Sequence, residues 1–166
     1  MSNHREAGFT LVDTMIAVTI VAVLATLAIP FYRDYVVRTQ VVEGLTLAAG
    51  SADAVAQTYM EDGVWPADNS AAGLGAPDGY QGLYVTSIEV VDGSVRITYG
   101  GLANAVIRGR TLTIEPAVDG AGDIRWQCGA AESPARQIAR AMNGGDEEDG
   151  SMATVDAKYV PDGCRP

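Results

Sequence analysis

The sequence predicts an α+β fold in which one long N-terminal helix packs on a four-stranded antiparallel sheet. A helical pattern of apolar residues continues from about residue 9 to residue 62. The residues after it form short segments rich in Val, Ile and Thr, separated by Gly-containing turn signals. Because the chain has 166 residues and 48% of them are apolar, it is long enough for one domain with its own core.

The N-terminal part of the chain changes abruptly from polar to apolar. Residues 1–8 are polar, and no residue from 14 to 32 carries a formal charge. As a helix, this uncharged stretch would be about 28 Å long, close to the hydrocarbon thickness of a bilayer. A secretory signal peptide would have a shorter apolar run that ends at a small-residue cleavage site, whereas here the helical pattern continues beyond the weak candidate site at residues 28–30. We therefore expect a membrane-spanning helix over residues 9–32.

Two residues stand out in this apolar segment. Asp13 lies at its start, where a carboxylate is costly and is usually paired or functional. The alternative is that Asp13 only marks the membrane interface. Pro30 lacks a backbone N–H and clashes with the preceding turn, so we expect the helix to kink or loosen near residues 26–30.

After residue 33 the helical pattern becomes one-sided, which is typical of an amphipathic helix. The apolar residues that recur at spacings of three and four are Val41, Leu45, Ala48, Ala52, Val55 and Tyr59. Gly63 is expected to end the helix. The complete helix would be about 80 Å long, which is more than the rest of the chain can bury. Its first half must therefore be covered by lipid or by other copies of the chain.

The remaining elements are predicted from turn signals. Residues 63–82 are rich in Gly, Ala, Pro and Asp and are expected to form a loop. The four predicted strands are residues 84–91, 94–99, 111–118 and 123–128. Asp92-Gly93 separates the first pair, and residues 119–122 separate the second, so both pairs are expected to be hairpins. The sheet would lie across the amphipathic half of the helix.

The last quarter of the chain contains both cysteines, Cys128 and Cys164. They would form a disulfide if this part of the chain leaves the cytoplasm, and two free thiols if it stays there. Between them, Ser133-Pro134 and the following apolar pattern predict a short capped helix. Tyr159-Val160 is a candidate for a final short strand.

The composition argues against several classes of function. A net charge of −10 is a poor match for phosphate backbones, so direct nucleic-acid binding by one subunit is disfavoured. The only histidine, His4, lies in the polar N-terminal segment, which removes histidine-dependent nucleophilic catalysis from the rest of the chain. Two cysteines are too few for a convincing zinc site. The acidic run 146–149 is expected to be a solvated loop, with a weak calcium site as the alternative. We expect no metal and no cofactor, although a carboxylate enzyme stays open.

The segment GFTLVDTMIAVTIVAVLATLAIPFYRDY resembles the N-terminal motif of type IV prepilins of Gram-negative bacteria. Like that motif, it combines a glycine after a short charged leader, an aromatic residue, an acidic residue and an apolar helix with an internal proline. The segment VVRTQVVEGLTLAAGSADAVAQTY is similar to the second helical half of the family. The residues around Cys128 and Cys164 are similar to the flanks of its C-terminal disulfide loop.

The resemblance implies three parts and a processing step. Residues 1–8 would be a leader, 9–32 a transmembrane and filament-core helix, and 33–166 a globular head with a disulfide between the two cysteines. A prepilin peptidase would cut between Gly8 and Phe9 and methylate the new Phe9 amine. In a filament, the Asp13 carboxylate would meet the Phe9 ammonium of the next subunit, although glutamate is usual at this position in the family.

The function implied is that of the major structural subunit of a type IV pilus, for adhesion, twitching motility and DNA uptake or phage attachment. Its partners would be identical copies, the peptidase, an inner-membrane platform, assembly ATPases and an outer-membrane secretin. The precursor would lie in the inner membrane with its head in the periplasm, and the assembled pilus would be extracellular. The alternatives are a minor pilin or a type II secretion pseudopilin and, less favoured, a membrane-tethered binding domain or enzyme.

Overall fold

The computed structural model describes residues 9–128 and 155–164. The chain divides into two compact units, Met1–Val36 and Val37–Pro166. In the described residues, the elements are the helix α1 (Leu11–Asp62), the strands β1 (Val85–Val91), β2 (Ser94–Tyr99), β3 (Thr111–Val118) and β4 (Ile124–Cys128), and three single-turn 3₁₀ helices, η1 (Pro77–Gly79), η2 (Ala157–Tyr159) and η3 (Asp162–Cys164).

The long N-terminal helix is confirmed as α1, which has 52 residues. It ends where the sequence predicts. Gly63 has a φ of +70° and its backbone N–H donates to the Tyr59 carbonyl at 2.9 Å. Glycine adopts this left-handed conformation without a steric cost, so it closes the helix.

The second unit, Val37–Pro166, is called the globular unit below. The second half of α1 is its central helix, on which the sheet packs. Of the predicted apolar positions, Val41, Ala48, Ala52 and Val55 are buried. Leu45 and Tyr59 are half-buried at the margin of this face, where the Tyr59 ring stacks on Trp65 with centroids 3.8 Å apart. The buried face also contains four residues outside the predicted set, namely Val37, Gln40, Gly44 and Ser51.

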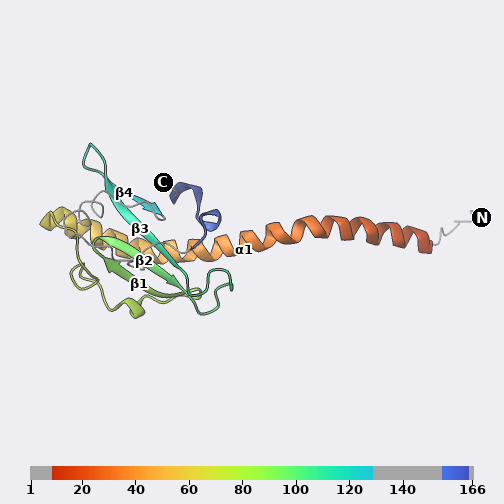
Figure 1. The fold of residues 1–166 in the computed structure, drawn as a ribbon, viewed down its shortest axis with the longest axis horizontal. Coiled ribbons are helices and arrows are strands. Elements are labelled where there is room, and N and C mark those ends of the chain that lie inside the picture. Colours follow the sequence, from red (N-terminus) through yellow and green to blue (C-terminus); the bar gives the residue numbers. More distant parts are fainter. Residues whose placement is uncertain (1–8, 129–154, 165–166) are drawn as a thin grey trace, which may run out of the picture. The chain divides into compact units, whose positions relative to one another are not determined.

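The predicted four-stranded antiparallel sheet is confirmed in the described residues, and its strand order is β1-β2-β3-β4 (Figure 1). The predicted hairpin turn between β1 and β2 is present, with a φ of +48° at Asp92 and +80° at Gly93. Positive φ at both central residues matches the right-handed twist of the strands, which explains why Asp-Gly is favoured there. The inner face of the sheet adds Ile88, Ile97 and Leu112 to the core, all with no exposed surface.

The prediction of a final strand at Tyr159-Val160 is wrong. Tyr159 ends the 3₁₀ helix η2, whose N-cap Asp156 accepts a hydrogen bond from the Lys158 backbone N–H at 3.0 Å. Pro161 follows immediately, and a proline cannot donate to a strand ladder. The local cap and the proline therefore override the strand preference of Tyr and Val. The short helix predicted after Ser133-Pro134 lies outside the described residues.

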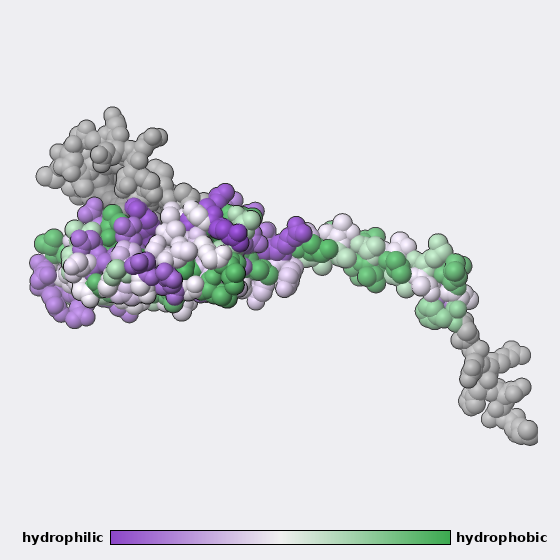
Figure 2. Space-filling model, turned by 90° about the horizontal axis from the view of Figure 1, so that it is seen from below, coloured by the Kyte–Doolittle hydropathy of each residue, from purple (hydrophilic) through white to green (hydrophobic). Residues whose placement is uncertain are grey.

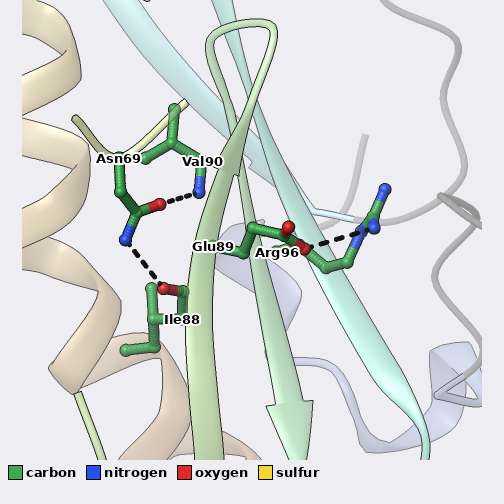
Figure 3. Close-up of polar contacts among 5 residues, drawn as sticks. All are labelled: Asn69, Ile88, Glu89, Val90 and Arg96. Atoms are coloured by element: carbon green, nitrogen blue, oxygen red, sulfur yellow. Dashed lines mark hydrogen bonds and ion pairs between the residues drawn. The ribbon is translucent and has the colours of Figure 1, made fainter. Parts of the chain in front are cut away.

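The loop after α1 closes the free edge of β1 through one side chain. Asn69 is 6% exposed, and its Nδ2 donates to the Ile88 carbonyl at 3.2 Å while its Oδ1 accepts from the Val90 N–H at 2.6 Å (Figure 3). The same Nδ2 donates to the Gly75 carbonyl at 3.0 Å. Figure 3 also shows Glu89, between the two bonded residues, turned to the other side of the strand toward Arg96. The Asn69 amide thus replaces the backbone of a missing neighbouring strand.

Replacing Asn69 with alanine is expected to destabilise the globular unit by about 2–3 kcal/mol, because a buried N–H and a buried carbonyl on β1 lose their partner. Urea unfolding of the full chain in detergent measures the change. The exposed neighbour Ser70 provides the matched control, since Ser70→Ala removes a hydroxyl from the same loop without touching β1. Equal, small effects of the two substitutions would contradict the prediction.

Candidate functional site

The N-terminus of α1 is closed by a reciprocal cap between Thr10 and Asp13. The Asp13 N–H donates to Thr10 Oγ1 at 3.2 Å, and the Thr10 N–H donates to Asp13 Oδ2 at 3.0 Å. The Thr10 hydroxyl also donates to Asp13 Oδ2, at 2.6 Å. This is the geometry of a capping box, which satisfies two backbone N–H groups that the first turn of a helix leaves without partners.

The cap leaves part of the Asp13 carboxylate available. All of its hydrogen bonds with Thr10 use Oδ2, so Oδ1 remains as an acceptor for a further group. Phe9 immediately precedes the cap and is 81% exposed. Phe9 and Asp13 therefore both lie at the N-terminal end of α1, on either side of Thr10, while Gly8 lies outside the described residues.

The first half of α1 exposes almost only apolar surface. An 18-residue stretch of it is long and apolar enough to cross a membrane, and none of that stretch is buried by the rest of the chain. Its polar hydroxyls are satisfied internally, because Thr19 donates to the Met15 carbonyl at 2.7 Å and Thr26 to the Ala22 carbonyl at 2.6 Å. Such internal bonds remove the cost of a free hydroxyl in an apolar environment. This surface requires lipid or other protein around it.

Pro30 lies inside α1, which continues through it as one helix. In an α-helix the N–H of residue 30 would donate to the carbonyl of Thr26. Because proline has no N–H, the Thr26 carbonyl lacks this bond. The kink that the sequence predicts near residues 26–30 stays a prediction.

The disulfide joins Cys128 at the end of β4 to Cys164 in η3, with their Cα atoms 4.9 Å apart. Cys128 is 1% exposed, so its half of the bond belongs to the core. The bond fixes η2 and η3 on the sheet and closes a segment with a sequence separation of 36 residues.

Signs of an enzyme or metal site are weak in the part of the chain that is described. No group of three or more His, Cys, Asp or Glu side chains is placed to hold a metal ion in residues 9–128 and 155–164, and the acidic run 146–149 lies outside them. A depression of about 410 Å³ beside β1 is lined partly by Asp68 and Glu89. These carboxylates are engaged elsewhere, since Asp68 accepts from the Ala71 N–H at 2.8 Å and Glu89 pairs with Arg96 at 3.4 Å.

Sequence reasoning missed Thr10. The signal was present, because a threonine followed three residues later by an acidic residue just before an apolar run is typical of a capping box.

Comparison with known proteins gives matches along nearly the whole chain. Residues 37–165 match the family model described as pilin (bacterial filament), and residues 3–29 match the prokaryotic N-terminal methylation motif. A protein of Neisseria gonorrhoeae named type IV major pilin protein PilE is 35% identical, with 98% of this chain and 96% of that protein aligned. A fimbrial protein of Neisseria meningitidis serogroup B is 36% identical over the same shares. The type IV major fimbrial protein FimA of Dichelobacter nodosus is 31% identical, with 94% and 93% covered.

Proposed function

We propose that this chain, which belongs to the pilin family of bacterial filament proteins, is the major structural subunit of a type IV pilus. One observation carries the proposal. The first half of α1 presents an apolar surface that the chain itself does not bury, and that surface begins at a capped acidic residue. Only lipid or neighbouring copies can cover it, and a filament core supplies the copies.

The Asp13 carboxylate would align neighbouring subunits. Cleavage after Gly8 creates a positive amine at Phe9, and Oδ1 of Asp13 in an adjacent copy would accept a hydrogen bond from it. Each charge unpaired in an apolar bundle costs several kcal/mol, and pairing removes much of that cost. Aspartate is one methylene shorter than the glutamate usual in the family, so contact requires a closer approach of the helices. The pairing therefore favours one position of each subunit along the filament axis relative to its neighbour.

The same proposal covers processing, location and partners. A prepilin peptidase removes residues 1–8 and methylates Phe9, in keeping with the N-terminal methylation motif. Before assembly, the subunit is held in the inner membrane by residues 9–32 with its head in the periplasm. An assembly platform, cytoplasmic ATPases and an outer-membrane secretin then build an extracellular fibre that serves adhesion and twitching motility.

The charge of Asp13 can be tested separately from its cap. Asp13→Ala removes both, whereas Asp13→Asn keeps an acceptor for the Thr10 N–H and removes the charge. Both variants are expected to lower the amount of sheared surface fibre by about tenfold or more, because an unpaired buried amine costs at least one factor of ten in an equilibrium. Asp13→Glu is expected to assemble, and Asp78→Ala, on the exposed turn η1, serves as the control.

N-terminal sequencing of the same sheared material tests processing and abundance. A major subunit is expected to dominate the fibre and to begin at Phe9. Normal fibre numbers with Asp13→Asn would refute the charge pairing, and a mature protein that begins at Met1 would refute the proposed cleavage after Gly8. A minor pilin or pseudopilin would be recognised by its scarcity in the fibre.

A further inference from the structure

Three exposed aromatic residues, Phe31, Tyr32 and Tyr35, lie at or just after the end of the uncharged stretch of α1. Their exposed fractions are 77%, 68% and 65%. Because an α-helix turns by about 100° per residue, their spacings place all three within one arc of about 100° on its surface. We call these three residues the aromatic cluster. They belong to the first compact unit, Met1–Val36, so the cluster is defined without reference to the globular unit.

The aromatic cluster coincides with the change from uncharged to charged sequence. No residue between Asp13 and Arg33 carries a formal charge, and residues 10–30 contain no aromatic side chain. Figure 2 shows hydrophobic residues predominating along this half of α1. The helix from Asp13 to Arg33 is about 30 Å long, which matches the hydrocarbon core of a bilayer. The members of the cluster lie within about 3 Å of Arg33 along the helix axis, where the helix would pass from hydrocarbon to headgroups.

The hydroxyls of Tyr32 and Tyr35 differ from the threonine hydroxyls of the same segment. Thr19 and Thr26 donate to backbone carbonyls one turn earlier in α1. Among the described residues, no partner accepts a hydrogen bond from either tyrosine hydroxyl. A hydroxyl without a partner is costly in an apolar environment, whereas a tyrosine ring gains by leaving water. Each tyrosine side chain therefore requires apolar surroundings along its ring and polar surroundings at its tip.

We propose that the aromatic cluster binds the boundary between the acyl chains and the headgroups of the bilayer, and that it fixes how deep the first unit lies in the membrane. At this boundary a tyrosine ring contacts acyl chains while its hydroxyl bonds to headgroups or water. Phe31 adds apolar area on the same side of the helix. The inference rests on the membrane-anchored stage of the proposed function and names the residues that set the depth of the anchor.

A neighbouring copy of the chain is the alternative cover for the aromatic cluster. An apolar helix of another copy would contact the rings as well as lipid does. It would offer few polar groups to the tyrosine hydroxyls, because Thr19 and Thr26 use their own hydroxyls within their own helix. The headgroup boundary supplies both kinds of surroundings at once, which favours lipid over a second copy.

Anchoring at one end determines how the helix responds to bilayer thickness. While the aromatic cluster is held at its interface, a change in hydrocarbon thickness alters the surroundings mainly at the other end of the segment, near Asp13. Without the cluster, the helix is free to shift along the membrane normal, and the two ends share the change. The two cases can be distinguished by measuring depth near each end.

The test uses the full chain, with its disulfide intact, in nanodiscs of dimyristoleoyl, dioleoyl or dierucoyl phosphatidylcholine. Ala17→Cys and Ala28→Cys, in separate proteins, each carry a nitroxide at an exposed position four residues from Asp13 and from Tyr32, respectively. Collision rates with oxygen and with a water-soluble nickel complex report the depth of each nitroxide. From the shortest to the longest lipid, the change in depth at residue 17 is expected to be about twofold larger than at residue 28, or more.

Replacing both tyrosines tests whether the aromatic cluster causes this asymmetry. Tyr32→Leu combined with Tyr35→Leu keeps apolar area but removes the rings and hydroxyls, so the changes at residues 17 and 28 are expected to become equal. The matched control combines Ile20→Leu with Ile29→Leu, which alters two side chains of the same segment that are 56% and 54% exposed. This control is expected to keep the asymmetry of the wild type.

Three results would overturn the inference. Equal changes at the two labels in the wild type, or an asymmetry that survives the loss of both tyrosines, would exclude anchoring by the cluster. A tyrosine variant that keeps the wild-type asymmetry in nanodiscs but yields less sheared fibre would assign the cluster to contacts between copies. These results would leave the proposed function untouched. If neither nitroxide entered the bilayer, the membrane-anchored stage of that function would be refuted, and this inference with it.

Discussion

Removal of the disulfide is expected to destabilise the globular unit by about 4 kcal/mol, because the bond restricts a loop of the unfolded chain. Cys128 and Cys164 close a segment with a sequence separation of 36 residues, and Cys128 lies in the core. Alanine at both positions avoids placing a hydroxyl at the buried site. Urea unfolding of the full chain in detergent, compared with the oxidised wild type, measures the loss.

The reduced wild-type protein is the matched control for the disulfide. It is expected to unfold at a urea concentration close to that of the double alanine variant, and reductant should not change the variant at all. A loss below about 1 kcal/mol would mean that the unfolded chain is already compact in this region, so that the bond restricts little.

Replacing Gly44 with alanine is expected to destabilise the globular unit by about 2 kcal/mol. A Cβ at this position would lie 2.5 Å from the Tyr99 hydroxyl oxygen and 2.8 Å from its ring. Tyr99 has no exposed surface, and its hydroxyl donates to the Val41 carbonyl at 2.9 Å, so the ring has no room to move aside. Burial, and secondarily the nearby Glu43 charge, raise the Tyr99 pKa well above its usual range. Overpacking costs about 3 kcal/mol, and the better helix propensity of alanine returns only about 1 kcal/mol.

Gly50 provides the control for Gly44, because it lies in the same helix and a Cβ there would meet nothing within 4 Å. Gly50→Ala is expected to stabilise the chain by up to about 1 kcal/mol through helix propensity alone. In a Tyr99→Leu background, Gly44→Ala should lose most of its cost, and the double-mutant cycle isolates the contact. Equal effects at the two glycines would show that Tyr99 does not require glycine on α1.

The elements of the fold were predictable from the sequence because their signals are local. The 3.6-residue pattern and Gly63 define α1, and Asp92-Gly93 defines the first hairpin. Local signals also produced the one error, at Tyr159-Val160, where strand preference competed with the Asp156 cap and Pro161 and lost. These patterns alone therefore predict the helix and the four strands of the globular unit.

The contacts that hold the elements together were not predictable, since they join residues far apart in the sequence. Tyr99 and Val41 are separated by 58 positions, and Asn69 and Val90 by 21. No periodicity distinguishes Asn69 from the other polar residues of its loop. Of the candidate site, the charge of Asp13 could be found from its unusual surroundings, whereas its cap required attention to Thr10.

The Asn69 amide protects one edge of the sheet against pairing with strands of other chains. Chains can polymerise edge to edge through their sheets without limit only if each chain has two free edge strands, because each must pair with one neighbour on either side. Here the outer rim of β1 is already occupied by a side chain of the same molecule. If two copies paired only through the opposite edge of the sheet, at β4, the assembly would end at a dimer. Unlimited growth through backbone ladders of the amyloid kind is therefore blocked at this edge.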